Sequence, residues 1–164
     1  MTGAGRDIWW VKDDFNYLPE DADGDRTVVV HVGSMSNPQP NQWSKAGIMF
    51  RAGPGPDAAL YMVFLAGSRG ICPIWRSARG AHMGGGNCVQ SGATEAWLKV
   101  EKRTDAYASY VGSEAADGSV EWTLLHRAES LPAIAEADAY QVSRRPVGLP
   151  WSSSGMVLPE TKAP

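Results

Sequence analysis

Hydrophobic and polar residues alternate along this chain in short stretches, and turn-forming residues lie between the stretches. Residues 27–32, 45–51 and 60–66 are rich in apolar and β-branched side chains, and glycine, proline or aspartate clusters lie beside each of them. Short apolar stretches with this punctuation are typical of β-strands rather than helices. A tight turn separates 60–66 from a further apolar run at 71–78, so these two runs predict a β-hairpin.

The same pattern continues after a glycine-rich stretch at 79–92, which contains five glycines and is expected to be a long loop. Strands are predicted at 97–103 and 106–111, and an Asp117-Gly118 turn leads into a further alternating segment that starts at Val120. About eight short strands with turns at intervals of about ten residues favour an all-β sandwich or barrel. No repeat of about 20–50 residues occurs, which disfavours a propeller or solenoid.

We therefore predict an all-β fold of two packed antiparallel sheets. A structure dominated by helices would contradict this prediction. The alternation within the strands places one set of side chains on the inner faces of the sheets. We expect the following side chains to be largely buried: Val28, Val30, Ile48, Phe50, Val63, Leu65, Leu98, Val100, Trp122 and Leu124.

The pattern weakens from Ala128 onward, where five of the eleven prolines lie. Residues 131–137 are expected to hold a short helical turn. The chain divides into a sandwich domain at 1–143 and an irregular or disordered tail at 144–164. No apolar strand of normal length follows Arg127, so the sandwich is expected to be incomplete at its C-terminal end.

An incomplete sandwich leaves the edge of a strand uncovered, and such an edge pairs readily with another chain. The sequence therefore predicts either a homo-oligomer through this edge or an irregular strap that covers it. The apolar residues that such a strap would use are Leu131, Ile134, Tyr140 and Trp151.

The composition of the 164 residues is that of one globular domain, with 43% hydrophobic and 20% charged residues. The net charge of −3 argues against a nucleic-acid partner, and no apolar run is long enough for a membrane helix. The first seven residues lack the apolar segment of a secretory signal. Localisation stays open between an intracellular protein and a piece of a longer secreted one.

Two cysteines, Cys72 and Cys88, lie sixteen positions apart. The pair is compatible with one disulfide. A zinc site would need four ligands, and of the histidines only His82 lies near the cysteines in the sequence. The spacing of the cysteines does not decide between a disulfide, a zinc site and two free thiols.

Six segments in the expected order resemble the concanavalin A-like lectin/glucanase superfamily, and in particular its LamG-type jelly-roll accessory modules. The resemblance covers about residues 5–127, and its segments are Gly5–Trp9, Asp14–Tyr17, Trp43–Arg51, Trp75-Arg76, Trp97–Val100 and Asp117–Thr123. Trp10 stands where the opening motif of the family usually has glycine. The family's closing strand is matched only by a fragment, Val147–Ser152, in which Pro150 interrupts the pattern. The resemblance implies a jelly roll, and related modules are mostly extracellular.

The resemblance also implies a ligand site on a concave sheet face and its loops. Indole rings stack on the apolar faces of sugars, and arginine forks bind hydroxyl pairs, so tryptophan beside arginine suggests a glycan site. The ligand-binding residues predicted in this way are Arg51, Trp75, Arg76, Arg79 and Asn87. The other tryptophans of these motifs, Trp9, Trp43, Trp97 and Trp122, are expected to pack in the core or at strand ends.

No catalytic machinery is recognisable in the sequence. Glycosidases of this fold need two carboxylates that flank the scissile bond, and the Glu-x-Asp-x-x-Glu pattern that would supply them is absent. The chain also lacks the Gly-x-Ser-x-Gly motif of a nucleophile elbow. We therefore predict a non-catalytic binding module for carbohydrate. The alternatives are a structural or protein-interaction domain without a sugar site and, less favoured, a glycoside hydrolase.

No cofactor is predicted, with one exception. Asp21, Asp23 and Asp25 alternate in the way that gathers oxygen ligands around calcium. Arg26 stands at the position where an EF-hand loop requires glycine, which makes a calcium site a minor alternative.

Overall fold

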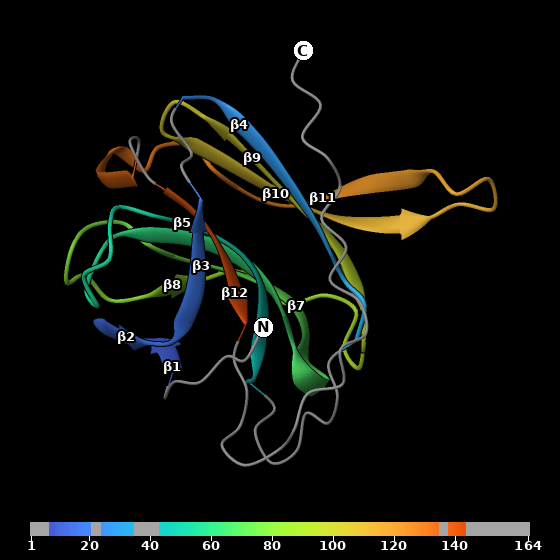
Figure 1. The fold of residues 1–164 in the computed structure, drawn as a ribbon, viewed down its shortest axis with the longest axis horizontal. Coiled ribbons are helices and arrows are strands. Elements are labelled where there is room, and N and C mark those ends of the chain that lie inside the picture. Colours follow the sequence, from blue (N-terminus) through green and yellow to red (C-terminus); the bar gives the residue numbers. More distant parts are fainter. Residues whose placement is uncertain (1–6, 21–23, 35–42, 135–137, 144–164) are drawn as a thin grey trace.

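Two antiparallel sheets pack face to face and form a β-sandwich (Figure 1). The computed structural model describes residues 7–20, 24–34, 43–134 and 138–143. Within these residues the connections are short turns and loops, and helical structure is limited to two 3-10 turns, η1 (Gly67–Arg69) and η2 (Pro132–Ile134). No helix in this part of the chain is long and apolar enough to cross a membrane.

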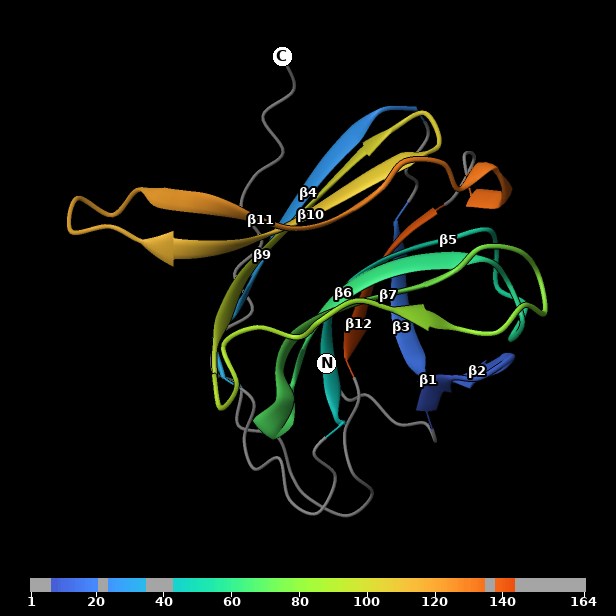
Figure 2. The same cartoon turned by 180° about the vertical axis from the view of Figure 1, so that it is seen from behind.

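One sheet has four strands in the order β11-β10-β9-β4. The strands are β4 (Arg26–Val32), β9 (Ala96–Arg103), β10 (Ala106–Glu114) and β11 (Val120–Ala128). The hairpin of β10 and β11 projects beyond the body of the sandwich in both views (Figures 1 and 2).

The other sheet has six strands in the order β3-β12-β5-β6-β7-β8. They are β3 (Asn16–Glu20), β5 (Lys45–Arg51), β6 (Leu60–Ala66), β7 (Gly70–Arg76), β8 (Gly84–Gly85) and β12 (Asp138–Ser143). The predicted hairpin is confirmed as β6 and β7, and the short strand β8 pairs with β7 at the far edge (Figure 2).

A small hairpin of β1 (Asp7–Trp9) and β2 (Lys12–Asp14) forms a third sheet (Figure 1). Trp10 turns the chain between these strands with φ of 56°, a left-handed conformation that glycine adopts at little cost. This conformation accounts for the glycine that the related motif usually carries here.

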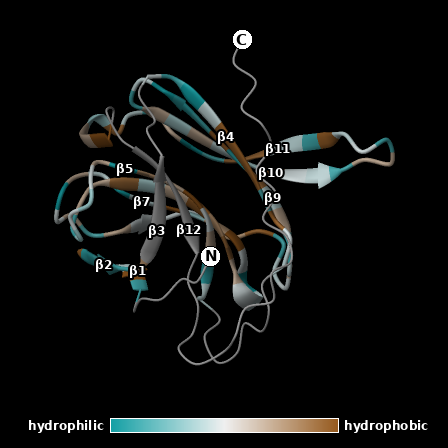
Figure 3. Ribbon diagram, viewed as in Figure 1, coloured by the Kyte–Doolittle hydropathy of each residue, from teal (hydrophilic) through white to brown (hydrophobic). Residues whose placement is uncertain are grey.

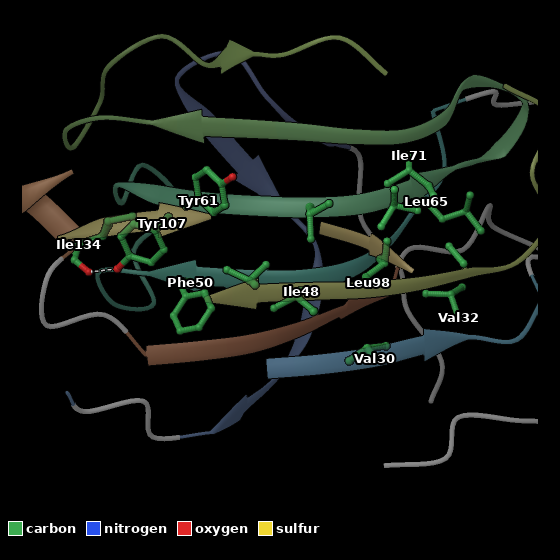
Figure 4. Close-up of a cluster of buried hydrophobic side chains, with 14 of the residues drawn as sticks. Val30, Val32, Ile48, Phe50, Tyr61, Leu65, Ile71, Leu98, Tyr107 and Ile134 are labelled. Carbon is green, nitrogen blue, oxygen red and sulfur yellow. Dashed lines mark hydrogen bonds between the residues drawn. The ribbon is translucent and has the colours of Figure 1, made fainter. Parts of the chain in front are cut away.

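Buried apolar side chains cover both faces of the six-stranded sheet. Hydrophobic residues colour much of its central strands in Figure 3. The inner face, which points toward the four-stranded sheet, contributes Phe50, Tyr61 and Leu65 to the main core (Figure 4). On the outer face, a second cluster includes Met62, Phe64 and Ile8, the last of which comes from β1. Because both faces are covered, β6 is a continuous apolar run instead of an alternating one.

The predicted core is confirmed for seven of its ten residues: Val30, Ile48, Phe50, Val63, Leu65, Leu98 and Val100. Val28 is only partly buried, although it packs against the same cluster. The prediction is wrong for Leu124, which is 49% exposed, and Trp122 is only half-buried.

A β-bulge explains the error on β11. Ser109 pairs with His126, but the next residue, Tyr110, pairs with Leu124, so Leu125 is an extra residue in the ladder. An extra residue reverses the alternation on one side of it. Leu125 packs toward the core, and Trp122 and Leu124 lie on the outer face with Tyr110.

The expectation of an incomplete sandwich is also wrong. Strand β12 pairs with β5 on one side and with β3 on the other, so it lies inside the six-stranded sheet and joins β3 to the remaining strands. Leu131 and Ile134, predicted as part of a covering strap, are 5% and 1% exposed in the main core. The Tyr107 hydroxyl donates a hydrogen bond to the Ile134 carbonyl (Figure 4). Trp151 and the predicted tail at 144–164 lie outside the described residues.

Candidate ligand-binding site

A pocket with a volume of about 380 Å³ lies on the outer face of the six-stranded sheet. Its floor is formed by side chains of β6 and β7, and its walls come from β1, from the residues that precede and begin β5, and from the loop that follows β8. The lining residues are Asp7, Trp9, Trp43, Lys45, Phe64, Cys72, Pro73, Ile74, Gly85, Gly86 and Cys88.

Two tryptophans line the pocket, Trp9 on β1 and Trp43 just before β5. Trp9 is 39% exposed, and Trp43 is half-buried with the guanidinium of Arg69 at 4.6 Å from its ring centroid. The ring of Phe64 lies on the floor. The pocket therefore combines three aromatic rings with a floor of apolar side chains.

The glycine-rich loop approaches β7 more closely than any other residue type would allow. A Cβ atom at Gly84 would lie 2.7 Å from the indole of Trp75, and one at Gly86 would lie 2.7 Å from the ring of Pro73. The main-chain N–H of Gly86 donates to the carbonyl of Pro73 at 3.1 Å. The predicted loop at 79–92 is thus tied to the sheet and forms one wall of the pocket.

A disulfide between Cys72 and Cys88 fixes the same wall. Of the alternatives that the sequence left open, the structure supports the disulfide. Beside it, Ile71 and Val89 exchange two main-chain hydrogen bonds of 2.8 and 2.9 Å. Among the described residues, no group of three or more His, Cys, Asp or Glu side chains is arranged to hold a metal ion.

The ionisable side chains that line the pocket form a pair. Lys45 Nζ lies 2.7 Å from Asp7 Oδ1, and the same ammonium donates to the Trp43 carbonyl at 3.3 Å. The Lys45 side chain is buried beside Phe64, whereas the Asp7 side chain is 46% exposed. Because the cysteines are bridged, Asp7 and Lys45 are the charged side chains among the described lining residues, and they are of opposite sign.

The prediction that Arg51 and Arg76 bind ligand in an open groove is contradicted. Both side chains are 0% exposed, and both contact the carboxylate of Asp13, which is also fully buried. The Asp13 oxygens lie 2.6 Å from Arg51 Nη1 and 2.8 and 2.6 Å from Arg76 Nη1 and Nη2. These arginines hold β2 against the sheet.

Trp75 and Arg76 do not share a site because consecutive strand residues point to opposite faces. Trp75 lies on the inner side of the sheet, where it stacks on His126 with ring centroids 4.5 Å apart. His126 in turn lies 3.2 Å from the hydroxyl of Tyr61, measured from Nδ1. Burial lowers the pKa of this imidazole and raises the pKa of Tyr61 to about 12.

The other predicted ligand residues lie on the surface. Arg79 is exposed and donates to both carboxylate oxygens of Asp57 at 3.0 and 3.1 Å, which lowers the pKa of that carboxyl. Asn87 is exposed in the loop beside Cys88, but it does not line the pocket. Of the calcium candidates, Asp25 accepts a hydrogen bond from the Thr104 N–H at 2.7 Å, and Asp21 and Asp23 lie outside the described residues.

Sequence reasoning assigned Trp9 and Trp43 to packing and did not single out Asp7 or Lys45. One signal in the sequence could have found them. Asp7 and Trp9 are alternate residues, and so are Trp43 and Lys45. Alternate residues of an extended segment have their side chains on the same face, so each pair places an indole ring beside a charged group.

The comparisons with known proteins bear on the fold. No family model matches the chain, and no curated protein matches it in sequence. A variant of human galectin-16 matches in structure with a TM-score of 0.53 over 86% of this chain and 91% of that one, at 11% identity. The chain shares the two-sheet antiparallel sandwich fold of this galectin. At this level of identity the likeness extends to the fold alone, because one sandwich architecture supports many functions.

Proposed function

We propose that this chain is a non-catalytic carbohydrate-binding module of the LamG type, and that it binds a neutral saccharide in the pocket between Trp9 and Trp43. The observation that carries this proposal is the combination of two tryptophans and one neutralised ion pair in a single pocket. The likeness to a galectin supports it at the level of the fold.

The aromatic rings supply the apolar part of sugar recognition. The C–H faces of a pyranose pack on indole rings, which bury a large area without requiring hydrogen bonds. A volume of about 380 Å³ lies within the range of small-molecule sites, near its lower end. The pocket therefore suits a short saccharide or the end of a longer chain.

The ion pair supplies the polar part. Asp7 is half-exposed at the pocket, and a carboxylate accepts hydrogen bonds from sugar hydroxyls. A charged ligand would have to compete with the 2.7 Å contact between Lys45 and Asp7, whereas hydroxyl groups can add to it. We therefore assign neutral sugars, and not uronic acids or amino sugars, to this pocket.

The same residues argue for binding without catalysis. Hydrolysis of a glycosidic bond uses a pair of carboxyl groups placed on either side of the bond. Asp7 is the one carboxylate among the residues that line the pocket, and it is held by Lys45. Among the described residues that line the pocket, neither a general acid nor a second carboxylate is present.

A glycan array of the oxidised full-length chain, followed by calorimetric titration of the best neutral saccharide, tests the proposal. We expect Trp9→Ala and Trp43→Ala to weaken binding by about tenfold or more, since this corresponds to about 1.4 kcal/mol of lost stacking. Trp10→Gly is the matched control. Trp10 follows Trp9 and is 67% exposed, but it does not line the pocket, and glycine suits its left-handed backbone.

Binding of the control should stay within about twofold of the unmodified chain. The proposal fails if no neutral saccharide binds, or if Trp9→Ala and Trp43→Ala bind as well as Trp10→Gly. Preferential binding of acidic oligosaccharides would reject the assignment to neutral sugars while keeping the pocket as a sugar site.

A further inference from the structure

The four-stranded sheet carries an apolar patch on its outer face, the side that points away from the six-stranded sheet. Figures 1 and 2 show no other described element across this face. Because of the bulge at Leu125, the alternate residues Trp122 and Leu124 lie there, opposite Gly112 and Tyr110 of β10. Leu124 is 49% exposed and Tyr110 is half-buried. An exposed apolar patch of this kind usually marks an interaction site.

One row of this face is unusually continuous. His31, Trp97, Gly112 and Trp122 are neighbours across all four strands. His31 stacks on Trp97 with centroids 4.4 Å apart. A Cβ atom at Gly112 would lie 2.7 Å from Cβ of Trp97 and 3.0 Å from Cζ3 of Trp122. The two tryptophans therefore lie close to the strand between them, at a position where a larger residue than glycine would clash with both.

A charge pair lies beside this row. Lys99 Nζ is 3.0 Å from Glu101 Oε1 and lies 5.0 and 4.1 Å from the ring centroids of Trp122 and Tyr110. The two charges are alternate residues of β9 and share the outer face. Consider a second copy related by a two-fold axis that lies in the interface, runs perpendicular to β9 and passes midway between Lys99 and Glu101. This axis would bring Lys99 of each copy opposite Glu101 of the other. This pair is therefore complementary in charge to the same pair of a second copy, and the other charged residues that the register places on this face, Arg103, Glu114 and Arg127, lie toward its ends.

We propose that a second copy of this chain packs on the outer face, so that two sandwiches form a symmetric dimer through their four-stranded sheets. Sheets with apolar faces pack on one another, and a two-fold interface uses the same surface on both partners. Strands of about eight residues at about 3.3 Å each, spaced by about 4.8 Å, give a face of about 500 Å². Two such faces reach about 1,000 Å², the lower bound for a specific interface.

Sedimentation velocity of the full-length chain over a range of concentrations tests this proposal. We expect a mass of twice 17.6 kDa at high concentration. Leu124→Lys should raise the dissociation constant by about tenfold or more, because it places a charge in the apolar patch. Thr123→Lys is the matched control, since Thr123 is exposed on the same strand but points to the opposite face. It should leave the dimer intact.

Charge reversal separates an interface from a structural role. Lys99→Glu and Glu101→Lys should each weaken self-association, because each gives the face two like charges. A mixture of the two variants should form the heterodimer, which a defect in folding would not produce. The proposal is overturned if the unmodified chain stays monomeric at about 100 µM, well above the Kd of a specific dimer. It is also overturned if Leu124→Lys and Thr123→Lys behave alike, or if the mixture fails to pair.

Discussion

Asp13 is the residue whose replacement tests the architecture of this chain most directly. Its carboxylate lies between Arg51 of β5 and Arg76 of β7, and all three side chains are 0% exposed. Replacement of Asp13 by Asn keeps the shape but removes the negative charge. Two buried guanidinium groups are then left without a counterion, and an amide N–H₂ group faces their donors.

The magnitude follows from the contacts that are lost and those that remain. Asp13 accepts three charge-assisted hydrogen bonds of 2.6–2.8 Å, each of which contributes about 1.5–3 kcal/mol. Main-chain carbonyls still satisfy other donors, those of Gly53 and Gly55 for Arg51, and those of Trp10, Ala58 and Ala81 for Arg76. We therefore expect a loss of about 3–5 kcal/mol, the usual cost of breaking a buried pair. That is a large part of a typical stability of about 5–15 kcal/mol.

Urea denaturation, followed by the fluorescence of the seven tryptophans, measures this loss. Asp57→Asn is the control, because it removes the partner of the exposed Arg79 and should leave the midpoint almost unchanged. If Asp13→Asn unfolds within about 1 kcal/mol of the unmodified chain, the carbonyls alone satisfy the arginines and the reasoning is refuted.

Three further perturbations have defined outcomes. Replacing Cys72 and Cys88 by Ala opens a loop of about 15 residues and should cost about 3 kcal/mol in urea denaturation, and titration of the unmodified chain should find no free thiol under denaturing, non-reducing conditions. Burial lowers the pKa of His126 in the folded chain, so the unfolded chain binds a proton there more readily. The contribution of His126 to the free energy of unfolding should therefore be complete above about pH 6.5 and decline below it. His126→Phe should remove this decline when the free energy of unfolding is measured as a function of pH. Gly47→Ala should lower the free energy of unfolding by about 2–3 kcal/mol, because the added Cβ would lie 2.1 Å from the carbonyl oxygen of Val63.

The sequence predicted the sandwich because the strands obey simple alternation and their turns carry glycine, proline or aspartate. It failed where a long-range partner decides the outcome. The bulge at Leu125 depends on how β11 pairs with β10, and nothing local in the sequence marks it. Strand β12 (Asp138–Ser143) was missed because it has few strongly apolar residues and four of the five C-terminal prolines follow it, yet it pairs on both sides.

The candidate site was predicted only in part. The disulfide is present, and residues of the glycine-rich loop line the pocket, as expected for local features of the chain. The arginines were misassigned because Asp13, which neutralises them, is 38 and 63 positions away in the sequence. A long charged side chain in a strand is usually exposed, and only the position of the β1–β2 hairpin shows that these two are not.

The buried charges of Asp13, Arg51 and Arg76 also explain how the pocket keeps its shape. Arg51 and Arg76 lie on either side of Leu60 in one row of the sheet, and Asp13 bridges them from the hairpin above. If β2 shifted by one residue relative to the sheet, Lys12 could take the position of Asp13 between Arg51 and Arg76. Repulsion between the three positive charges would then disfavour that register.

Because Asp7 pairs with Asp14 across the hairpin, the register of β2 fixes that of β1. The register of β1 in turn places Trp9 and Asp7 at the pocket. A buried ion pair often adds little to stability compared with apolar packing, but it penalises wrong arrangements strongly. In this chain that penalty holds the wall of the pocket in place. Asp13→Asn should therefore weaken the proposed saccharide binding as well as folding, even under conditions where the variant remains folded.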